Sequence, residues 1–176
     1  MKSQILLQAL GPVTSNILKI LETTLPKRFI SSSFALAPSL DLPSDAFDSA
    51  RKQFVSPEII SFIQENCRNT PYQKILGICD INAYSGRLNF VFGEAQFGGR
   101  SAAIYLARLR EEMGDLFDER IFLQRVVTEA VHEIGHLFGL QHCSSSSCVM
   151  YFSNSLEDTD KKGSDFCSAC KMKIRV

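Results

Sequence analysis

Residues 132–142 read HEIGHLFGLQH and contain all three histidines of the 176-residue chain. His132 and His136 are four residues apart, so on a helix they lie one turn apart on the same face and can chelate one metal ion. Gly139 lets the chain leave the helix sharply, which would bring His142 back as a third nitrogen ligand. Three protein ligands leave one tetrahedral position for water, which is typical of a catalytic zinc site.

The residues before this stretch predict the helix that carries it. From Leu123 to Phe138 apolar side chains recur at helical spacing, and a helical wheel puts His132 and His136 opposite this stripe. The two histidines therefore face a cleft or another part of the chain. Glu133 lies at the flank of the stripe, where it can take a proton from the metal-bound water as a general base. Three unrelated histidines at a helix end are the alternative, which the joint spacing of His, Glu and Gly disfavours.

Four of the six cysteines follow the histidines in two closely spaced pairs. Cys143 and Cys148 form C-x4-C, and Cys167 and Cys170 form C-x2-C, both within the spacing of zinc-knuckle ligands. Four thiolates leave no open position, so this zinc would be structural and would tie the polar tail to the end of the helix. The alternatives are four reduced thiols without metal, or two disulfides.

Hydrophobic patterning elsewhere predicts a small α/β sandwich. Strands at 74–80, 88–92 and 102–109 are separated by short gaps, which favours neighbours that are at least partly antiparallel. Residues 37–56, rich in Pro, Ser and Asp, predict a surface loop. The other predicted elements are a strand at 3–10, a helix from Thr14 or Ser15 that ends at Pro26, a strand at 28–36 and a helix from Ser56 to Asn66.

Charge and hydropathy exclude several classes of function. Lys+Arg and Asp+Glu are 19 each, so there is no basic footprint for sequence-independent nucleic-acid binding or for docking on a membrane. No apolar run approaches the roughly 18 residues of a bilayer span. The N-terminal residues lack the features of a signal peptide, so we expect a cytoplasmic protein with reduced thiols. Lys161, Lys162 and their acidic neighbours predict a solvated surface, and Cys67 and Cys79 predict buried small side chains.

The histidine motif H-E-x-x-H-x-x-G-x-x-H is similar to that of the metzincin zinc peptidases. Together with the C-x4-C-x-M and C-x-x-C patterns that follow, it resembles the archaemetzincins in particular. Residues 89–110, NFVFGEAQFGGRSAAIYLARLR, also look like the strands that precede the catalytic helix in that family.

The resemblance implies an α/β fold: a small metzincin-like domain with a mixed twisted sheet, a long catalytic helix and a C-terminal tail stapled by zinc. It implies two zinc ions per chain. The catalytic ion would be held by His132, His136 and His142 with Glu133 as general base, and the structural ion by Cys143, Cys148, Cys167 and Cys170.

Three further residues or segments gain a possible role from the resemblance. Met150, eight residues after His142, is the candidate for the methionine turn of metzincins, although methionine is more often a core residue. One of the predicted strands at 88–92 and 102–109 should lie at the cleft edge and pair with a substrate peptide, and residues 88–92 are favoured. Tyr151 could stabilise the oxyanion, with ordinary packing as the more common role of a tyrosine.

The sequence therefore predicts a zinc metalloprotease that hydrolyses peptide bonds in peptide or protein substrates. Whether it acts as an endopeptidase or an aminopeptidase stays open, and a monomer is favoured. The predicted division is an N-terminal α/β subdomain, 1–142, and a C-terminal subdomain, 143–176, with the methionine turn and the four cysteines. The alternative is a latent or non-catalytic, zinc-stabilised peptide-binding module, with the loop at 37–56 as the candidate cover of a latent site.

Overall fold

The computed structural model describes residues 3–110 and 118–174, and its centre is a five-stranded mixed sheet. β1 (Ser3–Leu10) lies between β2 (Ser32–Leu36) and β5 (Lys74–Cys79), and β5 lies beside β8 (Ser101–Tyr105), all in parallel. β7 (Gly93–Ala95) pairs antiparallel with β8 at the edge of the sheet. β1 has six consecutive buried residues because its parallel neighbours are covered by helices on both faces.

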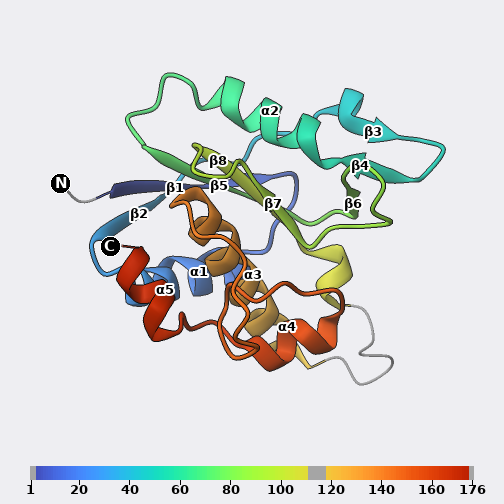
Figure 1. The fold of residues 1–176 in the computed structure, drawn as a ribbon. Helices are drawn as coiled ribbons and strands as arrows, with labels where there is room; N and C mark the ends of the chain where they lie inside the picture. Colours follow the sequence, from blue (N-terminus) through green and yellow to red (C-terminus); the bar gives the residue numbers. More distant parts are fainter. Residues whose placement is uncertain (1–2, 111–117, 175–176) are drawn as a thin grey trace.

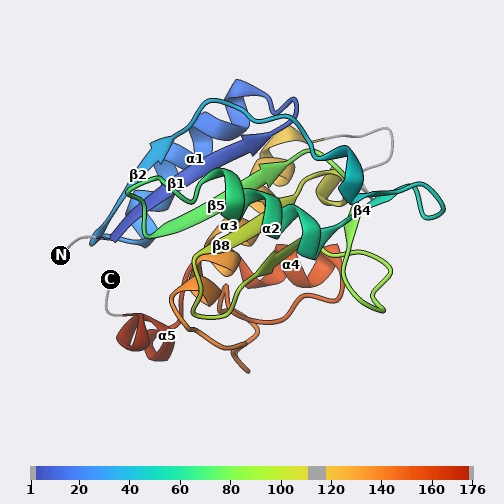
Figure 2. The ribbon, with the colours of Figure 1, turned by 90° about the horizontal axis from the view of Figure 1, so that it is seen from above.

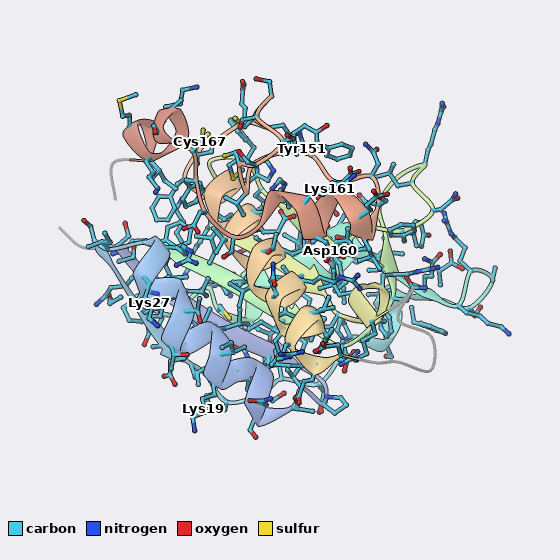
Figure 3. All side chains as sticks on the ribbon, turned by 90° about the horizontal axis from the view of Figure 1, so that it is seen from below. Lys19, Lys27, Tyr151, Asp160, Lys161 and Cys167 are labelled. Carbon is cyan, nitrogen blue, oxygen red and sulfur yellow. The ribbon has the colours of Figure 1, made fainter. Side chains whose placement is uncertain are left out.

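Helices cover both faces of this sheet (Figures 1 and 2). α1 (Ser15–Arg28) and the long α3 (Glu119–Leu137) pack side by side on one face, and α2 (Ser56–Asn66) packs on the other. Each face has its own cluster of buried apolar residues. Lys19 and Lys27 project from the solvent side of α1 (Figure 3). In the described part of the chain, no helix has the length and apolar character that a membrane span requires.

The tail after α3 packs into the same apolar cluster as α1 and α3. Cys148, Val149 and Met150 are fully buried in that cluster, with Phe166 beside them. Two short helices follow, α4 (Leu156–Lys162) against α3 and α5 (Ser168–Lys173) near the C-terminus. The division into subdomains 1–142 and 143–176 stays a prediction.

The segment predicted as a loop contains structure. Residues 37–56 include a 3₁₀ helix (Ser44–Ala46), β3 (Phe47–Asp48) and β4 (Gln53–Val55). With β6 (Ala83–Tyr84) these strands form a second, three-stranded sheet. The Asp48 side chain accepts hydrogen bonds from the backbone N–H groups of Ala50 and Arg51, which closes the hairpin. Strands of two or three residues are too short to produce a visible alternation, so the loop prediction was wrong here.

The prediction of a strand at 88–92 was also wrong. These residues form an irregular segment with a single bridge, Val91 to Ala83, and the edge strand begins only at Gly93. The apolar side chains of this segment line a cleft. Their hydrophobicity therefore reflects the cleft wall and does not indicate a strand.

Several element boundaries differ as well. α1 continues two residues beyond Pro26, which is tolerated because that proline lies exposed in the last turn. The strand predicted at 28–36 begins at Ser32, and the strand predicted at 102–109 ends at Tyr105, where a 3₁₀ helix (Ala107–Arg110) follows. The strands from residues 3 and 74, the start of α2 and the long helix are confirmed.

We expect Leu21→Ala to lower the free energy of unfolding by about 2–5 kcal/mol. Leu21 of α1 is fully buried in the apolar cluster on this face of the sheet, and truncating its side chain leaves a cavity. Ile30→Ala is the control, since Ile30 is exposed and its loss should change stability by less than about 0.5 kcal/mol. Urea denaturation measures both values, and equal effects of the two changes would contradict the packing described.

Candidate metal centre and cleft

The three predicted histidines come together at the end of α3. His132 and His136 lie on the same face of the helix, which ends at Leu137. Gly139 then has a φ of 83°, the left-handed conformation expected of a residue that ends a helix. The turn returns His142, and one ring nitrogen from each of the three side chains lies within 4.8 Å of the others.

Backbone carbonyls fix the orientation of two of these rings. Val149 O lies 2.7 Å from His132 Nδ1, and Leu140 O lies 2.7 Å from His136 Nδ1. A carbonyl only accepts, so each Nδ1 must donate, and each Nε2 then carries a lone pair. These two Nε2 atoms face each other at 3.0 Å. Two lone pairs at that distance repel each other unless a cation lies between them, so the donor set fits a divalent metal such as zinc.

All three histidines are held in the neutral form that metal binding requires. Burial lowers the pKa of His132 well below its usual value, and the nearby Lys162 ammonium lowers it further. Burial is also the largest cause of the lowered pKa values of His136 and His142. Neutral imidazoles at neutral pH bind a metal without first losing a proton.

Glu133 is buried between α3 and the edge strand. A Cβ built on Gly93 of β7 would lie 2.6 Å from its Oε1, so a side chain at position 93 would collide with the carboxylate. Burial raises the pKa of Glu133 well above its usual range, and the nearby Glu129 carboxylate adds to the rise. A carboxylate in such a site is a stronger base than an exposed one.

Met150 packs against α3 at Gly135. A Cβ built on Gly135, which lies between His132 and His136 on α3, would come 2.5 Å from Met150 Sδ. The buried thioether therefore packs on the helix backbone, and the backbone N–H of Cys143 donates to Met150 O at 2.8 Å. This position fits the predicted methionine turn. Tyr151 follows, and its predicted contact with an oxyanion stays a prediction.

The four predicted cysteines form the second cluster. The sulfur atoms of Cys143, Cys148, Cys167 and Cys170 all lie within 4.8 Å of one another. All four are free thiols. The pKa of Cys167 is lowered to about 7, and the largest cause is a hydrogen bond from the backbone N–H of Cys170. Four sulfur atoms at these separations fit a closed tetrahedral metal site. Cys67 and Cys79 are buried among the residues on the α2 side of the sheet, as predicted.

Sequence reasoning missed a buried ion pair beside the histidines. The Lys162 side chain, predicted to be solvated, is 0% exposed and its Nζ lies 3.1 Å from Glu129 Oε1. The same Nζ donates to Tyr151 O at 3.3 Å, and Thr159 Oγ1 donates to Glu129 Oε1. One turn earlier on α3, Arg125 contacts Asp160 at 2.7 Å.

A complementary pattern of charges could have revealed this contact. Arg125 and Glu129 are one turn apart on the polar side of α3, and Asp160 and Lys162 offer the opposite charges from α4. Figure 3 labels Asp160 on α4. Lys161, by contrast, is exposed and pairs with Glu157 on its own helix.

A cleft of about 470 Å³ adjoins the histidine cluster. Much of the segment from Leu88 to Phe97 lines one part of it, and residues 152–154 line another. The three histidines, Glu133 and the Glu129–Lys162 pair also line the cleft. The candidate ligands, the candidate base and an apolar wall therefore share one cavity.

We expect Lys162→Met to lower the free energy of unfolding by about 3–5 kcal/mol, because it leaves the Glu129 carboxylate buried without its counter-charge. The neighbouring change Lys161→Met should leave stability nearly unchanged, since its ion pair is exposed. The double variant Glu129→Gln/Lys162→Met should recover part of the loss. Chemical denaturation tests all three, and a Lys162→Met protein as stable as Lys161→Met would refute the buried pair.

Comparison with known proteins places this geometry in a family. Residues 34–176 match the sequence model of peptidase family M54. The archaemetzincin of Archaeoglobus fulgidus is 39% identical over 163 residues, 93% of this chain and 94% of that protein. The archaemetzincin of Methanocaldococcus jannaschii is 38% identical over 98% of this chain and 93% of its own length.

Solved structures agree with the sequence matches. The crystal structure of the A. fulgidus archaemetzincin in complex with malonate superposes with a TM-score of 0.83 at 37% identity, covering 97% of this chain and 99% of that one. That of Methanopyrus kandleri gives 0.84 at 31% identity, covering 98% and 93%. The chain therefore belongs to peptidase family M54, the archaemetzincins, and is a zinc metallopeptidase.

Proposed function

We propose that the cleft is the active site, with the catalytic zinc held by His132, His136 and His142 and with Glu133 as general base. One observation carries this proposal. The Glu133 carboxylate follows a candidate ligand directly in sequence, lies against the edge strand at Gly93, and lines the same cavity as the paired Nε2 atoms of His132 and His136.

The roles of the protein groups follow from their positions. His132, His136 and His142 would hold the zinc, which would supply Lewis acidity to the scissile carbonyl and to the attacking water. Glu133 takes the proton from that water and delivers it to the leaving amine as the C–N bond breaks. The Val149 and Leu140 carbonyls keep the two Nε2 lone pairs directed at the metal position.

The substrate is a peptide or protein segment that adds to the open edge of β7. Among the described strands, β7 pairs only with β8, so its other edge is free beside the cleft. An extended peptide can add to such an edge through main-chain hydrogen bonds. This strand replaces residues 88–92, which we predicted from the sequence for the same role.

The cysteine cluster holds a second, structural zinc in our proposal. Four thiolates would leave no open ligand position, and the cluster joins the segment after His142 to the first turn of α5. The free state of all six cysteines favours a reducing compartment such as the cytoplasm.

A zinc-stabilised module that binds peptides without cleaving them is the alternative, and Glu133 distinguishes the two. We expect Glu133→Gln to lower kcat by about 10²–10⁴-fold at unchanged zinc content, because the amide cannot accept the proton. The measurement is cleavage of a diverse peptide library by the zinc-loaded protein and by the variant. Cleavage that is equal in both would contradict the general-base role, and silence from both would favour the binding module.

We expect Cys170→Ser to lower the zinc content of the chain from two ions by at least one, because a hydroxyl is a poor zinc ligand. Cys67→Ser is the matched control, since Cys67 is also buried but lies outside the cluster. Metal analysis of the purified proteins gives the counts. Two ions retained in Cys170→Ser would remove the proposed structural site.

A further inference from the structure

The second sheet contributes no residue to the histidine or cysteine cluster, yet it contacts the wall of the cleft. Its three short strands, β3, β4 and β6, lie together at one end of the molecule (Figure 1). Two side chains of the β3–β4 hairpin, Arg51 and Gln53, donate hydrogen bonds to the backbone of Leu88 and Asn89. Leu88 and Asn89 line the cleft, whereas Arg51 and Gln53 do not. The hairpin therefore reaches the cleft through the backbone of its wall.

The cleft wall at 88–92 has little strand pairing, since a single bridge joins it to β6. Backbone carbonyls that no strand pairs need other donors. Leu88 O accepts from Arg51 Nη2 at 3.1 Å. Asn89 O accepts from Gln53 Nε2 at 2.8 Å and from Arg51 Nη2 at 3.3 Å. The position of the wall at these two residues thus depends on two side chains from the hairpin.

Gln53 is fixed in the orientation that this contact needs. The residue is 6% exposed, and its Oε1 accepts from Arg51 Nε at 3.2 Å. Since a guanidinium only donates, the amide oxygen must face Arg51 and the amide nitrogen must face the wall. Nε2 also donates to Asn82 Oδ1 at 3.2 Å, so the amide makes three hydrogen bonds.

Arg51 is held by the other two strands of the second sheet. Its guanidinium carbon lies 3.8 Å from the ring centroid of Tyr84 in β6, which is a cation–π contact. Tyr84 OH donates to Asp48 Oδ2 in β3 at 2.8 Å, and Asp48 Oδ1 accepts from the backbone N–H of Arg51 at 3.1 Å. The three strands together fix one guanidinium, whose charge strengthens its hydrogen bonds to the wall.

The two ends of the wall are attached to different sheets. At the inner end, Phe92 is 7% exposed, and its carbonyl accepts from the backbone N–H of Tyr105 in β8 at 2.8 Å. This end continues into Gly93, which lies against Glu133. The outer end, where Leu88 is 53% exposed, is held by the hairpin. Loss of the hairpin contact therefore releases the outer end and leaves the end beside the candidate base in place.

We infer that Arg51 and Gln53 are positioning residues of the peptidase, which hold the outer cleft wall at the distance from the histidine cluster that a bound peptide requires. They act through the backbone of Leu88 and Asn89. Because the wall contacts the peptide both before and during the reaction, its displacement weakens ground-state and transition-state binding alike, which raises KM and leaves kcat unchanged. This inference rests on the proposed function and adds to it the residues that set substrate affinity.

Two substitutions remove the contact in different ways. Gln53→Glu keeps the size of the side chain and the acceptor for Arg51 Nε, but an ionised carboxylate cannot donate to Asn89 O. Arg51→Met keeps a long side chain and removes the guanidinium. Lys52→Asn is the matched control, because Lys52 lies between the two on the hairpin, is exposed and has a φ of 54°, which asparagine tolerates.

The test peptide is selected from the library cleavage or, if nothing is cleaved, is the library member that zinc-loaded Glu133→Gln binds most tightly. Turnover by the zinc-loaded wild type and the hairpin variants gives KM and kcat. Fluorescence anisotropy gives the Kd of the peptide for Glu133→Gln with and without each hairpin change. Hydrogen–deuterium exchange measures the order of the wall without any substrate, and metal analysis gives the zinc content of each protein.

We expect Gln53→Glu and Arg51→Met each to raise KM, and the Kd in the Glu133→Gln protein, by about fivefold to tenfold, as the loss of a buried hydrogen bond predicts. Their kcat and zinc content should match those of the wild type. The amides of Leu88 and Val91, which donate to Ser85 O and Ala83 O, should exchange faster in both variants, with no change in α3. Lys52→Asn should match the wild type in every measurement.

Unchanged KM and Kd in both variants would overturn the inference, and so would unchanged amide exchange of the wall. A lower kcat per chain at constant KM would also overturn it, because that result indicates a smaller folded fraction and not a displaced wall. If the zinc-loaded wild type cleaves no peptide, the proposed function itself fails. In that case weaker peptide binding by both hairpin variants keeps the positioning role as a property of a binding module, and equal binding or no binding refutes it.

Discussion

The whole arrangement depends on the fact that α3 is buried on both sides. Its apolar stripe packs on the sheet and α1, as for any amphipathic helix. Its polar side is buried as well, with Arg125, Glu129, His132 and Glu133 all nearly inaccessible to solvent. Buried charges and polar groups are stable only with partners, so the chain after α3 has to supply them.

The tail meets this requirement residue by residue. Asp160 pairs with Arg125, Lys162 pairs with Glu129, and the Val149 carbonyl accepts from His132. The two helices of the tail have only seven and six residues, so they depend on contacts with α3 and with the apolar cluster rather than on their own stability. Val149, whose carbonyl accepts from His132, directly follows Cys148 of the cysteine cluster. The position of the cysteine cluster and the orientation of the His132 ring are therefore linked through one peptide bond.

The sequence was most informative where the chemistry depends on local spacing. His132 and His136 on one face, Gly139 at the turn and the four cysteines were all predicted because helical geometry and ligand spacing act over a few residues. The sequence was least informative where partners lie far apart. Lys162 was predicted to be solvated because its counter-charge Glu129 lies 33 residues earlier, and only the packing of α4 on α3 brings them together.

The prediction of a strand at residues 88–92, which line the cleft, failed for a different reason. Residues 88–92 have the composition of a strand because their apolar side chains line a cavity, and periodicity cannot separate that burial from burial in a sheet. The short β3, β4 and β6 fall below the length at which any pattern appears. The fold class could therefore be predicted, but the position of the edge strand beside the cleft could not.

Because the edge strand begins at Gly93, the sheet edge lies directly beside Glu133. Glu133 lies at the border between the apolar and polar sides of α3, and at that border the helix meets β7. The glycine removes the side chain that would collide with the carboxylate, and the same three-residue strand offers its free edge to a peptide. In our proposal, a peptide that pairs with β7 would lie along the strand that also contacts Glu133. Main-chain hydrogen bonds to β7 would then set which peptide bond lies at Glu133.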